Sequence, residues 1–90
     1  MGPQANHVTE RSPSVVMGKA LAHPLRVRIL TAMNTPLRRL SASEFSEETG
    51  EQLGTVAYHF RKLSKWGCID EVDTIQRRGA TEHVYYPTKR

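Results

Sequence analysis

The sequence has little cysteine and no long apolar run, and both absences narrow the class of protein. Its 90 residues contain one cysteine, Cys68, so one chain cannot form an internal disulfide framework or a multi-thiolate metal site. No apolar stretch approaches the length of a membrane span, and no charged segment followed by an apolar one begins the chain. We therefore expect a cytoplasmic protein, nucleoid-associated if prokaryotic, with no membrane as its partner.

Groupings of metal-binding or catalytic residues are missing as well. The four histidines, His7, His23, His59 and His83, do not have the spacing of metal ligands. Cys68 with His59 or His83 is the best candidate for a nucleophile and its base. However, Cys68 lies in an apolar run, where a buried structural thiol is typical. The sequence therefore predicts no enzyme activity, no cofactor and no metal.

The charge balance indicates the chemistry of the partner. The chain has 13 Lys and Arg residues against 9 Asp and Glu residues, which gives a formal net charge of +4. Such a balance favours an acidic partner, with nucleic acid first and an anionic membrane surface second. The length fits one small domain and leaves too little chain for a catalytic cleft with several layers around it.

The chain divides into an arm, one domain and a short tail. Residues 1–14 contain two prolines and almost no large apolar side chains, which predicts a flexible arm. The domain is expected over residues 15–87, followed by a tail at 88–90. A first helix is predicted over about 14–22, and a second begins at Pro24, because proline suits the first position of a helix.

A third helix is predicted from about Ala42 to Thr49. Ser41 and Glu44 stand three residues apart as a capping box, in which each side chain bonds to the backbone of the other residue. Gly50 is expected to close the helix in the left-handed conformation. The turn that follows is short, so this helix and the next are expected to form a helix-turn-helix.

The fourth helix, predicted over residues 53–66, is the most informative part of the chain. Four apolar residues recur at steps of three, four and three, and we expect them to be buried on one side of the helix. They are Leu53, Val56, Phe60 and Leu63. The outward set combines a hydroxyl, a phenol, a guanidinium and two ammonium groups, which together can contact base edges and phosphates. This set is Thr55, Tyr58, Arg61, Lys62 and Lys65. Taken alone, the pattern also fits an ordinary amphipathic helix with a solvated basic face.

A β-hairpin is predicted after the fourth helix. Residues 69–75 and 81–86 are rich in β-branched and aromatic side chains, and they flank a turn at 76–80 that carries Arg77 and Arg78. The expected fold class is therefore α+β and mainly α. It is a winged helix-turn-helix with four helices followed by a two-stranded hairpin wing.

Three segments in this order resemble the winged-helix transcription regulators of the ArsR type. Residues 19–30 are similar to the opening of that family, residues 55–63 to its recognition helix, and residues 78–83 to its wing. The resemblance covers roughly residues 15–86. It implies a winged-helix fold and regulation of transcription through double-stranded DNA.

Three departures limit what the resemblance implies. Many relatives have an aspartate helix cap at the position of His23. Histidine is a weaker cap than aspartate. Metal-sensing relatives use paired cysteines, or clustered histidine and acidic residues, and this chain has neither, so no metal sensing is expected. Relatives usually pair through a helix after the wing, and this sequence ends at Arg90. A homodimer is possible, with the first helix as a contributor.

The polarity of the fourth helix and its resemblance to the family assign a role to each candidate residue. Residues that enter or approach the major groove are expected to be Gly54, Thr55, Ala57, Tyr58 and Arg61. Arg61 is the expected guanine contact, because its guanidinium can donate to two acceptors on one base edge. The residues expected on phosphates or in the neighbouring minor groove are Lys62, Lys65, Arg77 and Arg78. The prediction is a sequence-specific DNA-binding regulator, expected to be a repressor.

A cluster of glutamates interrupts the basic surface, so an alternative to DNA binding remains. Glu47, Glu48 and Glu51 are expected to form a solvated face turned away from DNA, since they would repel phosphates. The alternative is a winged-helix module that binds another protein and no DNA.

Overall fold

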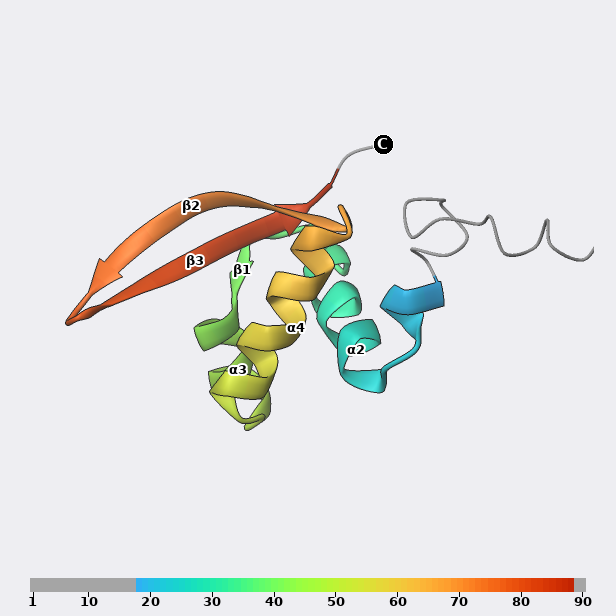
Figure 1. The fold of residues 1–90 in the computed structure, drawn as a ribbon, viewed down its shortest axis with the longest axis horizontal. Helices are drawn as coiled ribbons and strands as arrows, with labels where there is room; N and C mark the ends of the chain where they lie inside the picture. The colour runs from blue at the N-terminus through green and yellow to red at the C-terminus, as the bar shows by residue number, and fades with distance from the viewer. Residues whose placement is uncertain (1–17, 89–90) are drawn as a thin grey trace, which may run out of the picture.

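The computed structural model describes residues 18–88, and the expected arm at 1–14 lies outside them. Residues 18–21 are helical and belong to the predicted first helix. The next elements are α2 (Pro24–Asn34), β1 (Leu40–Ser41), α3 (Ala42–Thr49) and α4 (Leu53–Lys65). They are followed by β2 (Ile69–Arg77) and β3 (Ala80–Pro87). Figure 1 shows α2, α3 and α4 packed together, with β2 and β3 extending away from them as a long wing.

The helix boundaries follow local capping signals in the sequence. The side chain of His23 accepts a hydrogen bond from the backbone N–H of Leu25, so it caps α2 despite being an unusual residue for that role. Ser41 and Glu44 form the predicted capping box of α3. Gly50 ends α3 with φ 80°, a left-handed conformation that favours glycine. The starts of α2 and α3 and the end of α3 were therefore predicted correctly.

The sheet has three strands in the order β1-β3-β2, all antiparallel. The short strand β1 was not expected from the sequence, because Leu40 and Ser41 carry only a helix-start signal. Leu40 pairs with Tyr85 and Ser41 with Val84, which attaches the beginning of α3 to the wing. The turn of the hairpin is also tighter than predicted, since strand pairing continues to Arg77 and Ala80.

The core lies between the three helices and the base of the sheet. Phe45 of α3 and Tyr85 of β3 both contact the ring of Phe60, with ring centroids 6.3 and 5.4 Å apart. Other fully buried side chains are Ile29, Met33, Leu40, Val56, Leu63 and Ile69. Three of the four apolar positions predicted for the inner side of α4 are thus in the core, while the fourth, Leu53, is not.

Leu53 corrects the predicted stripe because 48% of its surface is exposed. It is the first residue of α4, and side chains on a helix lean toward the N-terminus. Its side chain therefore projects beyond the part of α4 that packs on the core. The inner side of α4 is completed by His59, which is only 4% exposed.

Candidate nucleic-acid interface

The turn between α3 and α4 fixes where α4 begins. The backbone N–H of Gly50 donates to the carbonyl of Ser46 at 2.8 Å. The hydroxyl of Ser46 donates to the carbonyl of Glu51 at 2.6 Å. The first bond satisfies a carbonyl in the last turn of α3, and the second satisfies a carbonyl in the turn that follows. As a result, α4 begins three residues after Gly50 in a defined orientation relative to α3.

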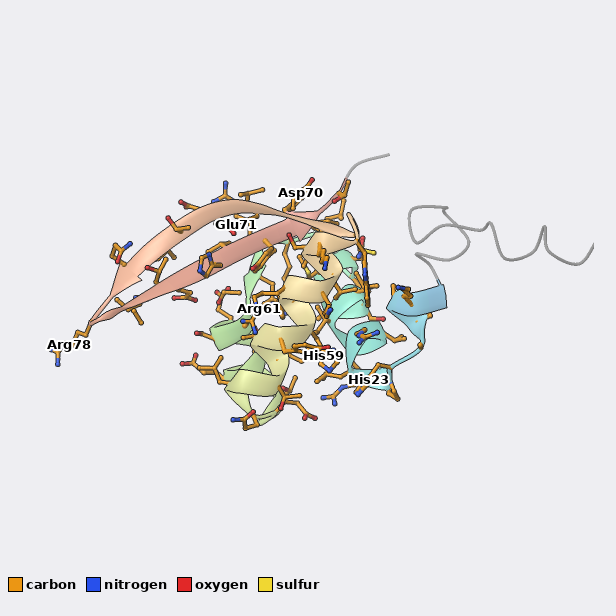
Figure 2. The ribbon with its side chains drawn as sticks, viewed as in Figure 1. His23, His59, Arg61, Asp70, Glu71 and Arg78 are labelled. Atoms are coloured by element: carbon orange, nitrogen blue, oxygen red, sulfur yellow. The ribbon has the colours of Figure 1, made fainter. Side chains whose placement is uncertain are left out.

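The outward face of α4 carries the candidate base-reading side chains. Tyr58 is 45% exposed, and Gly54, Thr55, Arg61 and Lys65 are also exposed. With 100° per residue, the centre of this face runs along Gly54, Tyr58, Arg61 and Lys65, directly opposite the buried stripe. Arg61, labelled on α4 in Figure 2, is exposed. The aromatic and basic side chains at the centre of the predicted interface are thus accessible to a duplex.

Two predicted contact residues lie at the edges of this face. Ala57 is half-buried on the side of α4 that faces the wing. Lys62 is half-buried on the opposite side, and its ammonium lies 5.7 Å from the ring centre of Tyr58. This cation–π distance brings the cation and the phenol side chain together on the outside of α4.

The side of α4 next to α2 is held by a histidine–arginine contact. Arg26 donates from Nε to Nδ1 of His59 at 3.0 Å, and its guanidinium also lies 4.8 Å from the ring centre of Trp66. The ring of His23 lies 4.4 Å from that of His59 (Figure 2). Burial lowers the pKa of His59, and the nearby His23 and Arg26 lower this pKa further. The neutral imidazole can therefore accept the hydrogen bond from Arg26 that links α4 to α2.

The wing carries its basic residues at the tip. Arg78 lies at the far end of the hairpin, well away from the helices (Figure 2). Arg77 donates from Nε to Glu82 at 2.8 Å, so its charge is partly neutralised. Glu82 also accepts a hydrogen bond from the hydroxyl of Ser41 at the start of α3. These two bonds lower the pKa of Glu82, with Ser41 as the larger cause. Glu82 therefore ties the wing to α3.

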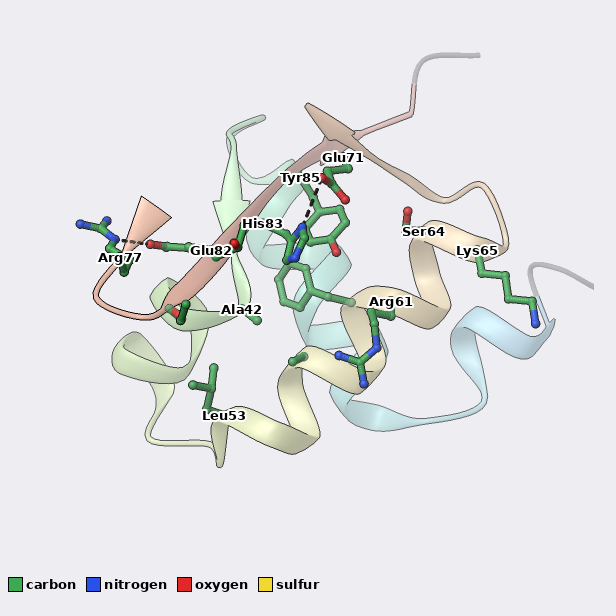
Figure 3. A pocket seen from close by; sticks show the side chains of 15 residues that line it. Ala42, Leu53, Arg61, Ser64, Lys65, Glu71, Arg77, Glu82, His83 and Tyr85 are labelled. Atoms are coloured by element: carbon green, nitrogen blue, oxygen red, sulfur yellow. Dashed lines mark hydrogen bonds and ion pairs between the residues drawn. The ribbon is translucent and has the colours of Figure 1, made fainter. Parts of the chain in front are cut away.

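A groove of about 740 Å³ separates α4 from the wing. On the α4 side it is lined by Leu53, Ala57, Arg61 and Lys65. On the wing side it is lined by Arg77, Glu71, Glu82 and His83, and Figure 3 shows the Glu71–His83 and Arg77–Glu82 contacts along that wall. The groove therefore has a basic helical wall and a wing wall of mixed charge.

The acidic cluster proves to be largely paired. Glu48 receives two hydrogen bonds from Arg38, at 2.7 and 3.1 Å, and these bonds lower the pKa of its carboxyl. Glu51 forms an ion pair with Arg28 at 2.7 Å, whereas Glu47 is exposed. Helix α4 itself contains no acidic residue. Negative charge lies across the groove that Arg61 also lines, on the wing wall at Glu71 and Glu82.

Two features of the site were not found from the sequence. Gln52 caps α4, because its side-chain oxygen accepts the backbone N–H of Thr55 at 2.8 Å. A residue just before the first apolar position of a helix is the usual signal for a cap, but glutamine is not a common cap residue. The Arg26–His59 contact joins residues 33 positions apart, and no local pattern indicates such a pair.

Within residues 18–88 no group of three potential metal ligands is found. No described helix is long and apolar enough to cross a membrane.

Comparisons with known proteins agree with the fold described above. Residues 21–71, just over half of the chain, match the family model described as a helix-turn-helix domain. The structure is similar to that of HlyU from Vibrio cholerae N16961, with a TM-score of 0.61. The two sequences are 23% identical, and the similarity covers 86% of this chain and 75% of that one. A search of the curated proteins found no match.

Proposed function

Given that the chain belongs to the helix-turn-helix family, in its winged, ArsR-like group of DNA-binding transcription regulators, we propose that it is a sequence-specific repressor of transcription. It binds double-stranded DNA by placing α4 in the major groove, and the tip of the wing contacts the backbone or the neighbouring minor groove. The supporting observation is the outer face of α4, which is open to solvent and carries Tyr58, Arg61 and Lys65 opposite the buried side of the helix.

The geometry divides the contacts into two kinds. Arg61 lies at the centre of the exposed face, where its guanidinium can reach two acceptors of a guanine. Tyr58 and Ala57 adjoin it on either side and can contact base edges or a thymine methyl. Lys65 at the end of α4 and Arg78 at the wing tip are exposed cations that suit phosphates. The first kind selects sequence, and the second fixes position.

In this proposal the protein represses transcription by occupying its operator. A small domain bound at an operator excludes another protein from the same DNA without further contacts. Placing the selected site just after the start of transcription of a reporter tests this idea. Expression that falls when the protein is present supports repression, and expression that rises indicates activation.

Selection of bound sequences from a random duplex library is the primary test of sequence-specific binding. An enriched site supports the proposal, and a two-fold symmetric site with half-sites about one DNA turn apart indicates a homodimer. Binding to the enriched duplex is then measured by fluorescence anisotropy at two salt concentrations. A steep loss of affinity with salt is expected, because phosphate contacts release counterions.

Variants assign the contacts to residues. Arg61→Ala should cost about 1 to 3 kcal/mol of binding free energy and relax the choice of base. Arg77→Ala combined with Arg78→Ala should weaken all duplexes about equally and lower the salt dependence. Arg28→Ala is the control for Arg61→Ala, since it removes one guanidinium, ion-paired with Glu51, from α2 outside the proposed interface. If the variants at the interface bind like the parent, α4 and the wing are not the docking surface.

The alternative function is a winged-helix module that binds another protein. The exposed Leu53 at the edge of the groove favours it, because a partner side chain could cover this apolar surface. Absence of duplex binding at low salt would support this alternative and contradict the DNA-binding proposal.

A further inference from the structure

The side chain of Gln52 lies over the outward face of α4, although the residue precedes the helix in sequence. Its side-chain oxygen and nitrogen both lie 3.3 Å from the position that a Cβ on Gly54 would take. Gly54 is at the centre of the outward face of α4, in line with Tyr58 and Arg61. The amide of Gln52 therefore covers the place where a side chain of residue 54 would project, and the missing Cβ of Gly54 leaves room for it.

The hydrogen bonds of Gln52 leave its two amide atoms in different states. Oε1 accepts the backbone N–H of Thr55 at 2.8 Å and the hydroxyl of Thr55 at 2.9 Å. A carbonyl oxygen has two lone pairs, so both are used within the protein. No hydrogen bond from Nε2 is found within residues 18–88. The amide thus presents two N–H donors and no available acceptor to a ligand in front of α4.

This arrangement changes which base the glutamine can read. A glutamine usually reads adenine with both amide atoms, accepting from N6 and donating to N7. Gln52 cannot do so while Oε1 is occupied by Thr55. Guanine offers two adjacent acceptors, N7 and O6, whereas cytosine offers a donor at the corresponding edge. A donor-only amide therefore matches guanine best.

Resting on the proposed function, we propose that Gln52 is a specificity-determining residue that reads a guanine as a donor-only amide held by Thr55. This assignment adds Gln52 to the interface. It also gives Thr55 a positioning role in place of the direct base or phosphate contact expected from the sequence.

The test compares four duplexes that differ only at one base pair of the selected site, the pair at which Gln52→Ser loses the base preference of the parent. Anisotropy of the parent should show guanine favoured by about 5- to 150-fold, the range of a good base contact. Gln52→Ser keeps a cap oxygen and removes the amide, so its four affinities should agree within about two-fold. Thermal melting by circular dichroism checks that this variant remains folded.

A second variant separates a base-reading role from a structural one. Thr55→Val removes the hydroxyl and leaves the backbone N–H, which returns one lone pair to Oε1 of Gln52. The amide can then both donate and accept, and the preference should move from guanine toward adenine. Gln76→Ser on the wing is the matched control, because it deletes the same amide elsewhere and should leave the base preference unchanged.

The outcomes separate the inference from the proposed function. A parent that binds no duplex contradicts the proposed function itself. A parent that binds specifically, while Gln52→Ser keeps the same enriched bases at every position, overturns the role of Gln52 alone. A parental preference for adenine at the position sensitive to Gln52 also overturns the donor-only assignment, as does Thr55→Val with an unchanged preference.

Discussion

Acidification should loosen the contact between α2 and α4 through one residue, His59. The fold favours the neutral ring, because this ring accepts a hydrogen bond from Arg26. It disfavours the protonated ring, which would be a buried cation beside Arg26 and His23. The pKa of His59 is lowered in the fold from its ordinary value of 6.5, chiefly by burial. In the unfolded chain the ring therefore takes up its proton at higher pH than in the fold.

The sign and size of the effect follow from linkage. Above about pH 6.5 the ring of His59 is neutral in both the folded and the unfolded chain, so its titration does not change the free energy of unfolding. Below that value the unfolded state binds the proton first, so the free energy of unfolding falls as the pH falls. The largest possible loss is about 1.4 kcal/mol for each pH unit below 6.5. At about pH 5.5 this corresponds to a fall in Tm of at most about 6 to 11 °C.

Thermal melts of the parent and of His59→Gln between about pH 7.5 and 5.5 measure the effect. Glutamine keeps an acceptor of similar reach and does not titrate, so the loss of Tm on acidification should be smaller in the variant. Subtracting the two pH curves removes the contributions of groups that do not contact position 59, which both proteins share. The same pH dependence in both proteins would refute the reasoning, because it would show that His59 does not titrate differently in the folded and unfolded states.

Three further substitutions test the fold that supports the site. Phe60→Ala should lower the free energy of unfolding by about 3 to 5 kcal/mol in a denaturant titration, because Phe60 is fully buried; a loss below 1 kcal/mol would contradict the described core. Gly50→Ala should cost about 1 to 2 kcal/mol, since the backbone there has φ 80°, and an unchanged midpoint would show another conformation at the turn. Glu82→Gln should cost about 1 to 3 kcal/mol at neutral pH by weakening the bonds from Ser41 and Arg77. Because the pKa of the Glu82 carboxyl is lowered from 4.5 in the fold, its contribution to the free energy of unfolding is present above pH 4.5 and is lost as the pH falls through the folded pKa. On acidification, the Tm of the variant should therefore fall less than the Tm of the parent.

Local signals account for most of what could be predicted about the fold. The capping box at Ser41 and the left-handed glycine at position 50 depend on a few neighbouring residues, and both were recognised in the sequence. The strand β1 could not be recognised in this way, because its two residues become a strand only by pairing with Tyr85 and Val84. Long-range pairing also explains why the turn of the wing was predicted to be longer than it is.

The site was predictable to the extent that helical periodicity decides exposure. Periodicity correctly placed Tyr58 and Arg61 on the open side of α4. It could not show that Leu53 lies beyond the core, since that depends on where α3 and the wing end relative to α4. Nor could it show which donors occupy the oxygen of Gln52. Contacts of this kind depend on side-chain geometry that residue types alone do not specify.

The acidic part of the wing limits how the proposed interface can meet a duplex. Asp70 and Glu71 lie toward the base of β2, while Arg78 is at the tip (Figure 2). Phosphates are repelled by the base of the wing and attracted by its tip, so we expect contacts at two separated places, the outer face of α4 and the hairpin turn. Because the tip stands far from α4 (Figure 2), we expect it to meet a different part of the duplex from Arg61. The wing would then add affinity for any sequence, and the choice of sequence would depend on α4 together with Gln52.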